Sequence, residues 1–351
     1  MPETQTKAQP THKPSSSKRR LSKTTIAGLI LLTLSIISAT LPFILMVVNS
    51  GMSTRAVDAH ESDVDKLSVA KANEAFAQAK EYNARLFQEG SQVLGEVSDP
   101  WSGGKDSLAQ EDKTYQKMLN VPADGIMATI RYPRLGINLP IRHGTSDVTL
   151  ASGAGHLYGT SLPVGGTNTH SVISAHTGYD RLMFDRLSMG QGRIGDFFYI
   201  TVLGHVLAYR VSSIFVIEPD DFSHFAIEAG KDQVTLLTCT PYGVNNKRML
   251  VTGQRVKIPN PAPDPKTVPQ DHPEYWLIAG VVLVWLLFML FVFLIVTKRR
   301  KKKLPARSLP AHHAAGVKNS AHSITSSESM REGNSVNSPS STSPANERRL
   351  Q

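Results

Sequence analysis

The single cysteine of the chain, Cys239, is the first candidate for chemistry, because a thiolate is a strong nucleophile. It follows an alternating apolar run at residues 233–238 and precedes a Pro- and Gly-containing turn at residues 240–243, so it should lie at the C-terminal end of a strand. A lone cysteine is more often a small buried hydrophobic residue than a nucleophile. It also excludes an internal disulfide, a zinc site made of cysteines alone and an iron–sulfur cluster.

An arginine stands where it could activate this thiol. Arg248 opens the next predicted strand, nine residues after Cys239, and a short loop at residues 244–247 separates the two. Antiparallel strands joined by such a loop bring their ends together. A nearby cation favours the thiolate over the thiol, so the pair is consistent with an activated nucleophile.

A thiol nucleophile usually works with an imidazole. His176 follows an apolar strand at residues 171–175 and precedes Thr177-Gly178, so it too should lie at a strand end. His156, in a turn-rich segment at residues 155–160, is the second candidate. Spacing alone leaves open that either histidine only packs or faces solvent.

The elements that must position these residues are short strands. Between residues 127 and 258 the apolar pattern has period two, and Gly- and Pro-containing turns interrupt it, which indicates a β-barrel or sandwich. One predicted strand is marked by the alternation of Ile137, Leu139 and Ile141. The others cover residues 171–175, 197–203, 207–217, 233–237 and 249–258, and a short helix is predicted at 181–187. Residues 52–89 contain no Gly or Pro and predict an amphipathic helix, with Asn83 as the polar exception on its apolar face.

Two apolar segments, at residues 26–48 and 277–296, are long enough to cross a bilayer, which takes about 20 residues. The first exceeds the apolar region of a cleaved signal peptide, so we expect an anchor. Tyr275 and Trp276 fit an aromatic belt at the outer end of the second.

The net charge of +9 resides in the two ends of the chain rather than on the predicted domain, so it indicates a lipid bilayer and not a nucleic-acid partner. By the positive-inside rule, the Lys/Arg clusters at residues 18–23 and 298–303 place both termini in the cytoplasm. The domain between the spans is then extracytoplasmic, and the protein is a two-pass protein of the cell membrane.

Three segments around these residues resemble one family. Thr235-Leu236-Leu237-Thr238-Cys239, followed by Arg248, is similar to the TLxTC…R signature of sortases. The Ser-Ala-His-Thr-Gly segment around His176 and the GHLYGTSLP segment from Gly155 resemble the matching sortase regions. The resemblance runs from about Tyr82 to Lys257. It implies a mainly β fold: an eight-stranded barrel with short helices, preceded by the N-terminal helix and flanked by the two transmembrane helices.

The resemblance also implies that His176, Cys239 and Arg248 are the catalytic residues of a cysteine transpeptidase. Cys239 would attack the Thr carbonyl of an LPxTG-like sorting signal and form a thioacyl enzyme. His176 would protonate the leaving Gly amine and later deprotonate the incoming amine. Arg248 would hold the substrate backbone or the oxyanion. We find no metal-ligand pattern and expect neither a metal nor a cofactor.

The subclass depends on Asp99-Pro100-Trp101, which resembles the lid motif of class C, pilus-assembling sortases. The second span with its Lys/Arg run is also typical of that class. In this interpretation Asp99 pairs with Arg248, Trp101 covers Cys239, and the partners are pilin subunits with LPxTG-like signals and an acceptor Lys. Asp-Pro is also a common turn opener, so the motif could be an ordinary turn.

Two alternatives remain at this stage. One is a housekeeping sortase that anchors surface proteins to the cell wall. The other is a non-catalytic membrane receptor with a β-domain and a cytoplasmic tail. The order of His176, Cys239 and Arg248 argues against the receptor, and the lid motif with the second span favours the pilus enzyme.

These inferences divide the chain into seven parts, from a cytoplasmic basic N-terminus to a basic cytoplasmic tail that we expect to be disordered. In order they are the N-terminus (1–25), a transmembrane helix (26–48), the extracytoplasmic helix and lid segment (49–126), the catalytic β-barrel (127–258), a Pro-rich spacer (259–274), a second transmembrane helix (275–297) and the tail (298–351).

Overall fold

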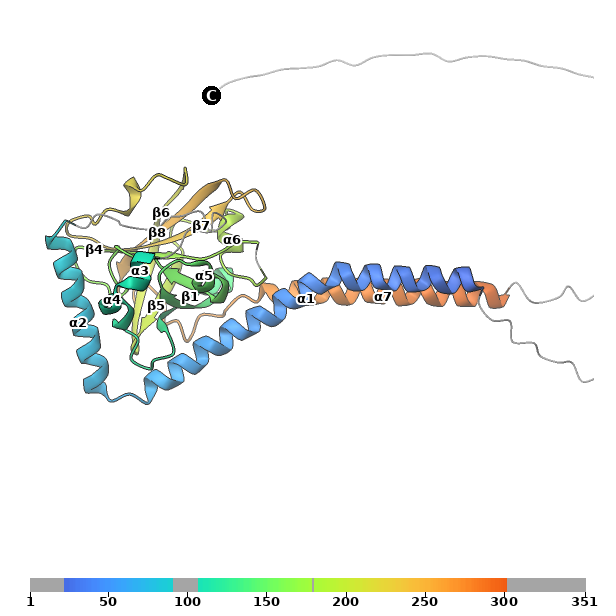
Figure 1. The fold of residues 1–351 in the computed structure, drawn as a ribbon, viewed down its shortest axis with the longest axis horizontal. Helices are drawn as coiled ribbons and strands as arrows, with labels where there is room; N and C mark the ends of the chain where they lie inside the picture. The colour runs from blue at the N-terminus through green and yellow to red at the C-terminus, as the bar shows by residue number, and fades with distance from the viewer. Residues whose placement is uncertain (1–21, 91–106, 179, 302–351) are drawn as a thin grey trace, which may run out of the picture. The chain divides into compact units, whose positions relative to one another are not determined.

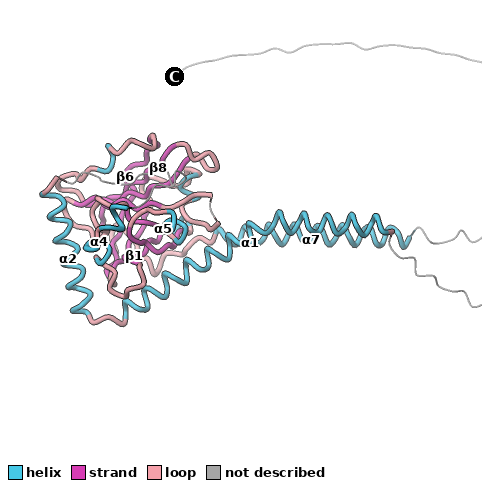
Figure 2. The backbone as a smooth tube through the Cα atoms, in the orientation of Figure 1, coloured by secondary structure: helices cyan, strands magenta, loops and turns pink. Residues whose placement is uncertain are grey.

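The computed structural model describes residues 22–90, 107–178 and 180–301, and most of its helices and strands are labelled in Figure 1. Its centre is a closed barrel with strand order β1-β2-β3-β4-β7-β8-β6-β5, which confirms the predicted eight-stranded fold (Figure 2). The strands are β1 (Ile126–Tyr132), β2 (Ile137–His143), β3 (Ala154–His156), β4 (Thr169–Ser174), β5 (Phe197–Val202), β6 (His205–Ile217), β7 (Asp232–Thr240) and β8 (Lys247–Val256).

Two strand pairs are parallel, β2 with β3 and β4 with β7, and the other pairs are antiparallel. The sequence pattern did not single out β1 or β3. β3 has only three residues, so it is too short to show an alternation. It is held by its neighbours instead: it pairs with β2 on one side and with β4 on the other.

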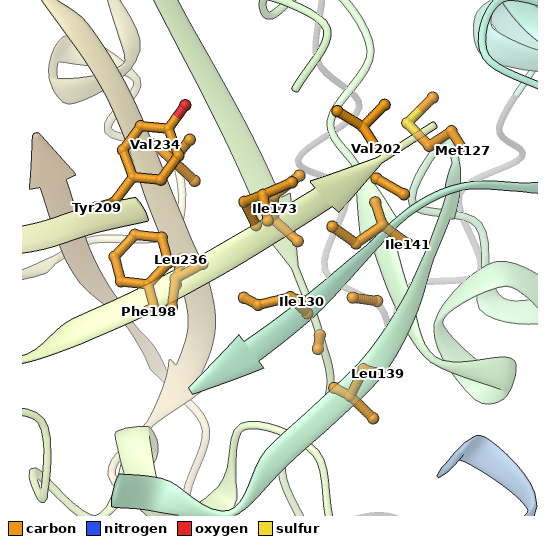
Figure 3. Close-up of a cluster of buried hydrophobic side chains, with 14 of the residues drawn as sticks. Met127, Ile130, Leu139, Ile141, Ile173, Phe198, Val202, Tyr209, Val234 and Leu236 are labelled. Carbon is orange, nitrogen blue, oxygen red and sulfur yellow. The ribbon is translucent and has the colours of Figure 1, made fainter. Parts of the chain in front are cut away.

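The barrel interior is filled by every second residue of its strands, as the pleat requires. Figure 3 shows the interior side chains Ile130, Ile173, Phe198 and Leu236 pointing toward one another from different strands. All four are fully buried. Because the interior is apolar and filled, polar chemistry is confined to the outer face and the ends of the barrel.

A second, smaller cluster lies on the outer face of the sheet. Leu237 and Leu250 alternate with interior residues of β7 and β8, and they pack with Phe225. Phe225 belongs to a 3-10 turn, Ser223–Phe225, in the β6–β7 connection. This connection therefore covers part of the outer face next to the strand ends that carry the candidate residues.

Two helices precede the barrel in place of the single helix expected over residues 52–89. α1 (Lys23–Asp65) continues without a break from the apolar segment, and α2 (Val69–Gln88) starts after it. Ser68 divides them, because its side chain accepts a hydrogen bond from the Lys71 backbone and caps α2. A strong N-cap can start a second helix even where the apolar pattern alone predicts a single continuous helix.

The remaining helices are short, apart from the last. They are α3 (Ser107–Glu111), α4 (Lys113–Lys117), α5 (Asp147–Ser152), α6 (Asp185–Ser188) and α7 (Pro273–Lys301). α1 and residues 273–298 of α7 are long and apolar enough to cross a membrane, as the sequence predicted. The chain divides into two units after Ile295, and of the second unit the structure describes only the end of α7.

The Pro-rich segment between β8 and α7 was expected to be a stiff spacer, and in the structure it lies against the barrel. The Tyr199 hydroxyl donates to the Pro263 carbonyl at 2.9 Å, and the Asp271 backbone N–H donates to the Pro133 carbonyl at 2.9 Å. The segment contains turns at residues 258–261 and 265–267, so it is not an extended spacer, and some of its remaining backbone groups bond to the barrel.

Candidate active site

Cys239 and Arg248 lie on the neighbouring strands β7 and β8, and His176 lies two residues beyond the end of β4, the strand on the other side of β7. In the antiparallel β7–β8 ladder, Cys239 is directly opposite Arg248. Residues that pair across two strands project from the same face and have Cβ atoms roughly 4.5–5.5 Å apart. The ladder therefore places the Cβ atoms of Cys239 and Arg248 close together on one face, as the short connecting loop predicted.

The parallel β4–β7 pairing brings His176 to the same level of the sheet as Cys239 and Arg248. These three residues are called the row below. The last paired residue of β4, Ser174, is opposite Leu237. The chain keeps this register beyond the strand end, since the Ala175 N–H donates to the Leu237 carbonyl at 3.2 Å and the Thr238 hydroxyl donates to the Ala175 carbonyl at 2.9 Å. Continued by one more residue on each strand, the register aligns His176 with Cys239.

The alternation of each strand decides which face the row occupies. Ile173, Leu236 and Met249 belong to the barrel interior, so residues an odd number of positions away along each strand face outward. Cys239, His176 and Arg248 all satisfy this rule. The row therefore lies on the outer face, at one end of the barrel, beside the cluster that contains Leu237 and Leu250.

All three side chains are largely shielded from solvent: Cys239 is 6% exposed, His176 9% and Arg248 4%. Burial lowers the pKa of His176, and the negative charges of Asp147 and Asp180 partly oppose this. The imidazole is thus neutral at neutral pH and can accept a proton.

The Arg248 guanidinium is oriented by the turn that follows β7. Its Nη1 donates to the carbonyls of Asn245 and Lys247, each at 3.2 Å. Because one acceptor lies in the β7–β8 connection and the other is the first residue of β8, the same turn that brings the strands together also orients the cation. A guanidinium with further donors in a low-dielectric site can stabilise a thiolate or an oxyanion.

Asp185 is a site residue that the sequence analysis did not find. It opens α6, it is 3% exposed, and its carboxylate accepts the N–H groups of Gly178 at 2.9 Å and Met183 at 2.8 Å. The His176 carbonyl accepts the Phe184 N–H at 3.2 Å, which closes the same loop. Asp185 lies inside the short helix predicted at residues 181–187, and it opens the helix only because the structure starts α6 at this residue, so the sequence pattern did not mark it as a first-turn aspartate.

The second candidate histidine, His156, lies in the interior of the fold instead. It is fully buried and pairs across the ladder with Ile173, three residues before His176. Its Nδ1 is 2.9 Å from the Tyr115 hydroxyl and its Nε2 is 2.8 Å from the Ser161 carbonyl oxygen. Burial lowers its pKa to about 4. With both ring nitrogens bonded, His156 connects structural elements and is not aligned with the thiol.

The lid residues predicted from the sequence, Asp99, Pro100 and Trp101, lie outside the described residues.

Comparison with known proteins gives one consistent answer. The Sortase domain family model matches residues 130–256. Sortase A of Streptococcus agalactiae is 30% identical over 128 residues, a match that covers 35% of this chain and 49% of that protein, so the chain spans about half the length of this relative. Sortase D of Bacillus subtilis is 29% identical over 159 residues, which is 75% of its length.

Solved structures extend the similarity over nearly complete chains. Sortase C-1 of Streptococcus pneumoniae is 36% identical with a TM-score of 0.52, covering 58% of this chain and 98% of that one. Sortase C1 of GBS Pilus Island 1 is 35% identical with a TM-score of 0.53, covering 64% and 98%. The fold and the sequence thus agree, and the chain belongs to the sortase family, with sortases C-1 among its structural neighbours.

Proposed function

We propose that this protein is a membrane-anchored class C sortase, which cleaves an LPxTG-like sorting signal after Thr and joins the acyl group to a Lys amine of another pilin. The observation that carries the proposal is the row formed by Cys239 and Arg248, paired across β7 and β8, and His176, just beyond the end of the neighbouring strand β4. The likeness to sortases C-1 and the two apolar helices support the class.

In the first half-reaction, His176 takes the proton of the Cys239 thiol, and the thiolate attacks the Thr carbonyl. A C–S bond forms, and the Thr–Gly C–N bond breaks. The His176 imidazolium gives its proton to the leaving Gly amine, so the imidazole is neutral again. Burial of His176 favours this transfer, because the same desolvation that lowers its pKa makes the imidazolium a stronger acid.

In the second half-reaction, the neutral amine of the acceptor Lys attacks the thioester. An isopeptide C–N bond forms, the C–S bond breaks, and His176 relays the amine proton to the departing thiolate. The thioester keeps the acyl group activated, so no nucleotide is consumed. Arg248 supports both halves, since its charge stabilises the thiolate and the tetrahedral oxyanion.

The proposal is tested with two peptides, one with an LPxTG sequence and one with an acceptor Lys. Wild-type protein should form the isopeptide product, and mass spectrometry should find a thioacyl adduct on Cys239. Cys239→Ala should abolish both without loss of fold, because one small side chain replaces another. Product formation by Cys239→Ala would contradict the thioacyl route.

A matched pair of arginine variants tests the cation. Arg248→Lys should lower kcat about 100-fold, the typical effect of removing one oxyanion donor. Arg255→Lys is the control: Arg255 lies on the same strand, over the Tyr209 ring, away from the row. Equal losses in both variants would mean that Arg248 only supports the strand.

The housekeeping alternative has its own support, because Streptococcus agalactiae sortase A is among the relatives. The acceptor distinguishes the two. When pilin and a cell-wall peptide amine compete, a pilus enzyme should use the pilin Lys and produce an SDS-resistant ladder. Preference for the cell-wall amine would favour the housekeeping enzyme.

We also propose that Asp99-Pro100-Trp101 covers the site, as its resemblance to the class C lid suggests. Burial of the Trp101 indole would contribute roughly 2–3 kcal/mol and an exposed Asp99 ion pair only about 0–1 kcal/mol. Trp101→Ala should therefore accelerate alkylation of Cys239 more than Asp99→Ala does. An unchanged alkylation rate in Trp101→Ala would make the motif an ordinary turn.

A further inference from the structure

α1 does not end where its apolar segment ends, but continues along the barrel. Beyond Val48, residues Ser53, Val57, His60 and Val64 are buried at spacings of three and four, which is one face of a helix. The apolar segment and the barrel-facing segment therefore belong to one helix, without a flexible linker between them.

One turn before this buried face, α1 contacts the loop that follows His176. The Asn49 side-chain amide donates to the Asp180 carboxylate at 2.9 Å and to the Asp180 carbonyl at 3.1 Å. The Leu182 N–H donates to the Ser50 hydroxyl oxygen at 2.9 Å. These bonds join residues about 130 positions apart, so they connect two separate parts of the fold.

The base of this loop is held by the barrel side of the fold: Phe184 bonds back to His176, and Asp185 bonds to Gly178. Its tip, at Asp180 and Leu182, is held by α1. The tip matters because Asp180 is one of the two anions that act on the imidazole.

We infer that Asn49 and Ser50 are positioning residues, through which the apolar helix α1 fixes the position of the loop that follows His176. Rotation or displacement of α1 would be transmitted to the Asp180 carboxylate and then to the imidazole. A second link reaches the same region from the chain before α7, because Asp271, two residues before that helix, forms an ion pair with Arg186 of α6. The inference rests on the proposed function.

The charged and titratable groups around His176 decide what a loosened tip would do. Asp147 of α5 and Asp180 of the loop raise its pKa against burial. Cys239 and Arg248 share its row, and Asp185 is bonded to loop backbone. If Asp180 moves away, one of the two carboxylates that raise the pKa of His176 is lost, and this pKa falls further. The limb of the pH–rate profile that belongs to His176 should then move to lower pH.

The test uses the full chain in detergent micelles and the two-peptide assay. Asn49→Ala and Ser50→Ala should each lower kcat about tenfold, the order expected for losing hydrogen bonds that hold the loop, with KM within about twofold. In Asn49→Ala the His176 limb should shift to lower pH. Asp180→Asn should give the same shift, and the double variant should shift no further. Ser50→Thr keeps the hydroxyl and should restore activity.

Thr54→Ala is the control, an exposed position of α1 one turn further on, and it should behave as wild type. Melting temperatures are measured for every variant. If Asn49→Ala and Ser50→Ala keep wild-type kcat and pH profile, or lose activity only in proportion to lost stability, the inference is overturned. An inactive wild type would overturn the proposed function instead, so the two failures are distinguishable.

Discussion

At the scale of single residues, the site depends on partners across strands. Cys239 and Arg248 share a ladder position, so their proximity follows from one register. His176 depends on a different, parallel register between strands far apart in sequence. The thiol–guanidinium pair is therefore local, whereas the imidazole joins it only when the barrel closes.

The two candidate histidines should respond differently to truncation. His176→Ala should lower kcat by about 10²- to 10⁴-fold, the usual contribution of a general acid–base group, with little change in melting temperature. His156→Ala should retain measurable activity and lose stability, because the Tyr115 hydroxyl and the Ser161 carbonyl lose their buried partner. Activity and thermal unfolding of both variants provide the measurement. Equal loss of activity would contradict the choice of His176.

At the scale of elements, the polar exception on α2 has a structural purpose. Asn83 is buried; its amide nitrogen donates to the Leu162 carbonyl at 2.9 Å, and its side-chain oxygen accepts the Leu162 N–H at 2.7 Å. Ala79 and Phe76 of the same face pack against the core. The apolar face binds α2 to the barrel, and Asn83 fixes its register by satisfying both backbone groups of one residue.

Asn83→Ala should therefore destabilise the fold by roughly 2–4 kcal/mol, since it leaves a buried donor and a buried acceptor without a partner. Asn73→Ala is the matched control, because Asn73 is an exposed asparagine of the same helix. Urea unfolding of the full chain in detergent compares the two. A loss below about 0.5 kcal/mol in Asn83→Ala would show that α2 is held by its apolar face alone.

At the scale of the whole molecule, the fold buries neutral histidines, and this sets how it responds to acid. Burial lowers the pKa of His143, His170 and His176, and that of His156 to about 4. The unfolded chain binds protons at these imidazoles below roughly pH 6.5, while the folded chain binds them only at lower pH. Acid therefore favours the unfolded state.

The free energy of unfolding should fall as the pH decreases from about 6.5 toward 4, and His156 alone should account for about 3 kcal/mol of the loss. Urea unfolding at several pH values measures the slope. His156→Gln should start from a lower stability at pH 7 and show a flatter slope. Stability that is independent of pH between 7 and 5 would contradict buried neutral imidazoles.

The two apolar helices give a prediction about topology. From the positive flanks we expect both termini to be cytoplasmic and the barrel to be outside. Protease added to intact protoplasts should digest the domain between residues 51 and 273 and spare a tag placed after Arg349. Immunoblotting for the tag detects the outcome, and digestion of the tag would place the C-terminus outside.

Much of this protein could be predicted from local patterns. Period-two alternation located most strands, long apolar runs located both membrane-type helices, and the residues beside Cys239 and His176 indicated strand ends. These features depend on neighbours in the sequence, so the sequence alone is sufficient to predict them.

Other features were decided only by the tertiary structure. Continuation of the parallel β4–β7 register beyond Ser174 places His176 level with Cys239, whereas His156 pairs with Ile173, three residues earlier. Packing tied Asn49 of α1 to Asp180, a contact that no local pattern predicts. Such contacts join residues that are far apart along the chain and share no periodicity, and they exist only once the barrel has closed and the helices have docked on it.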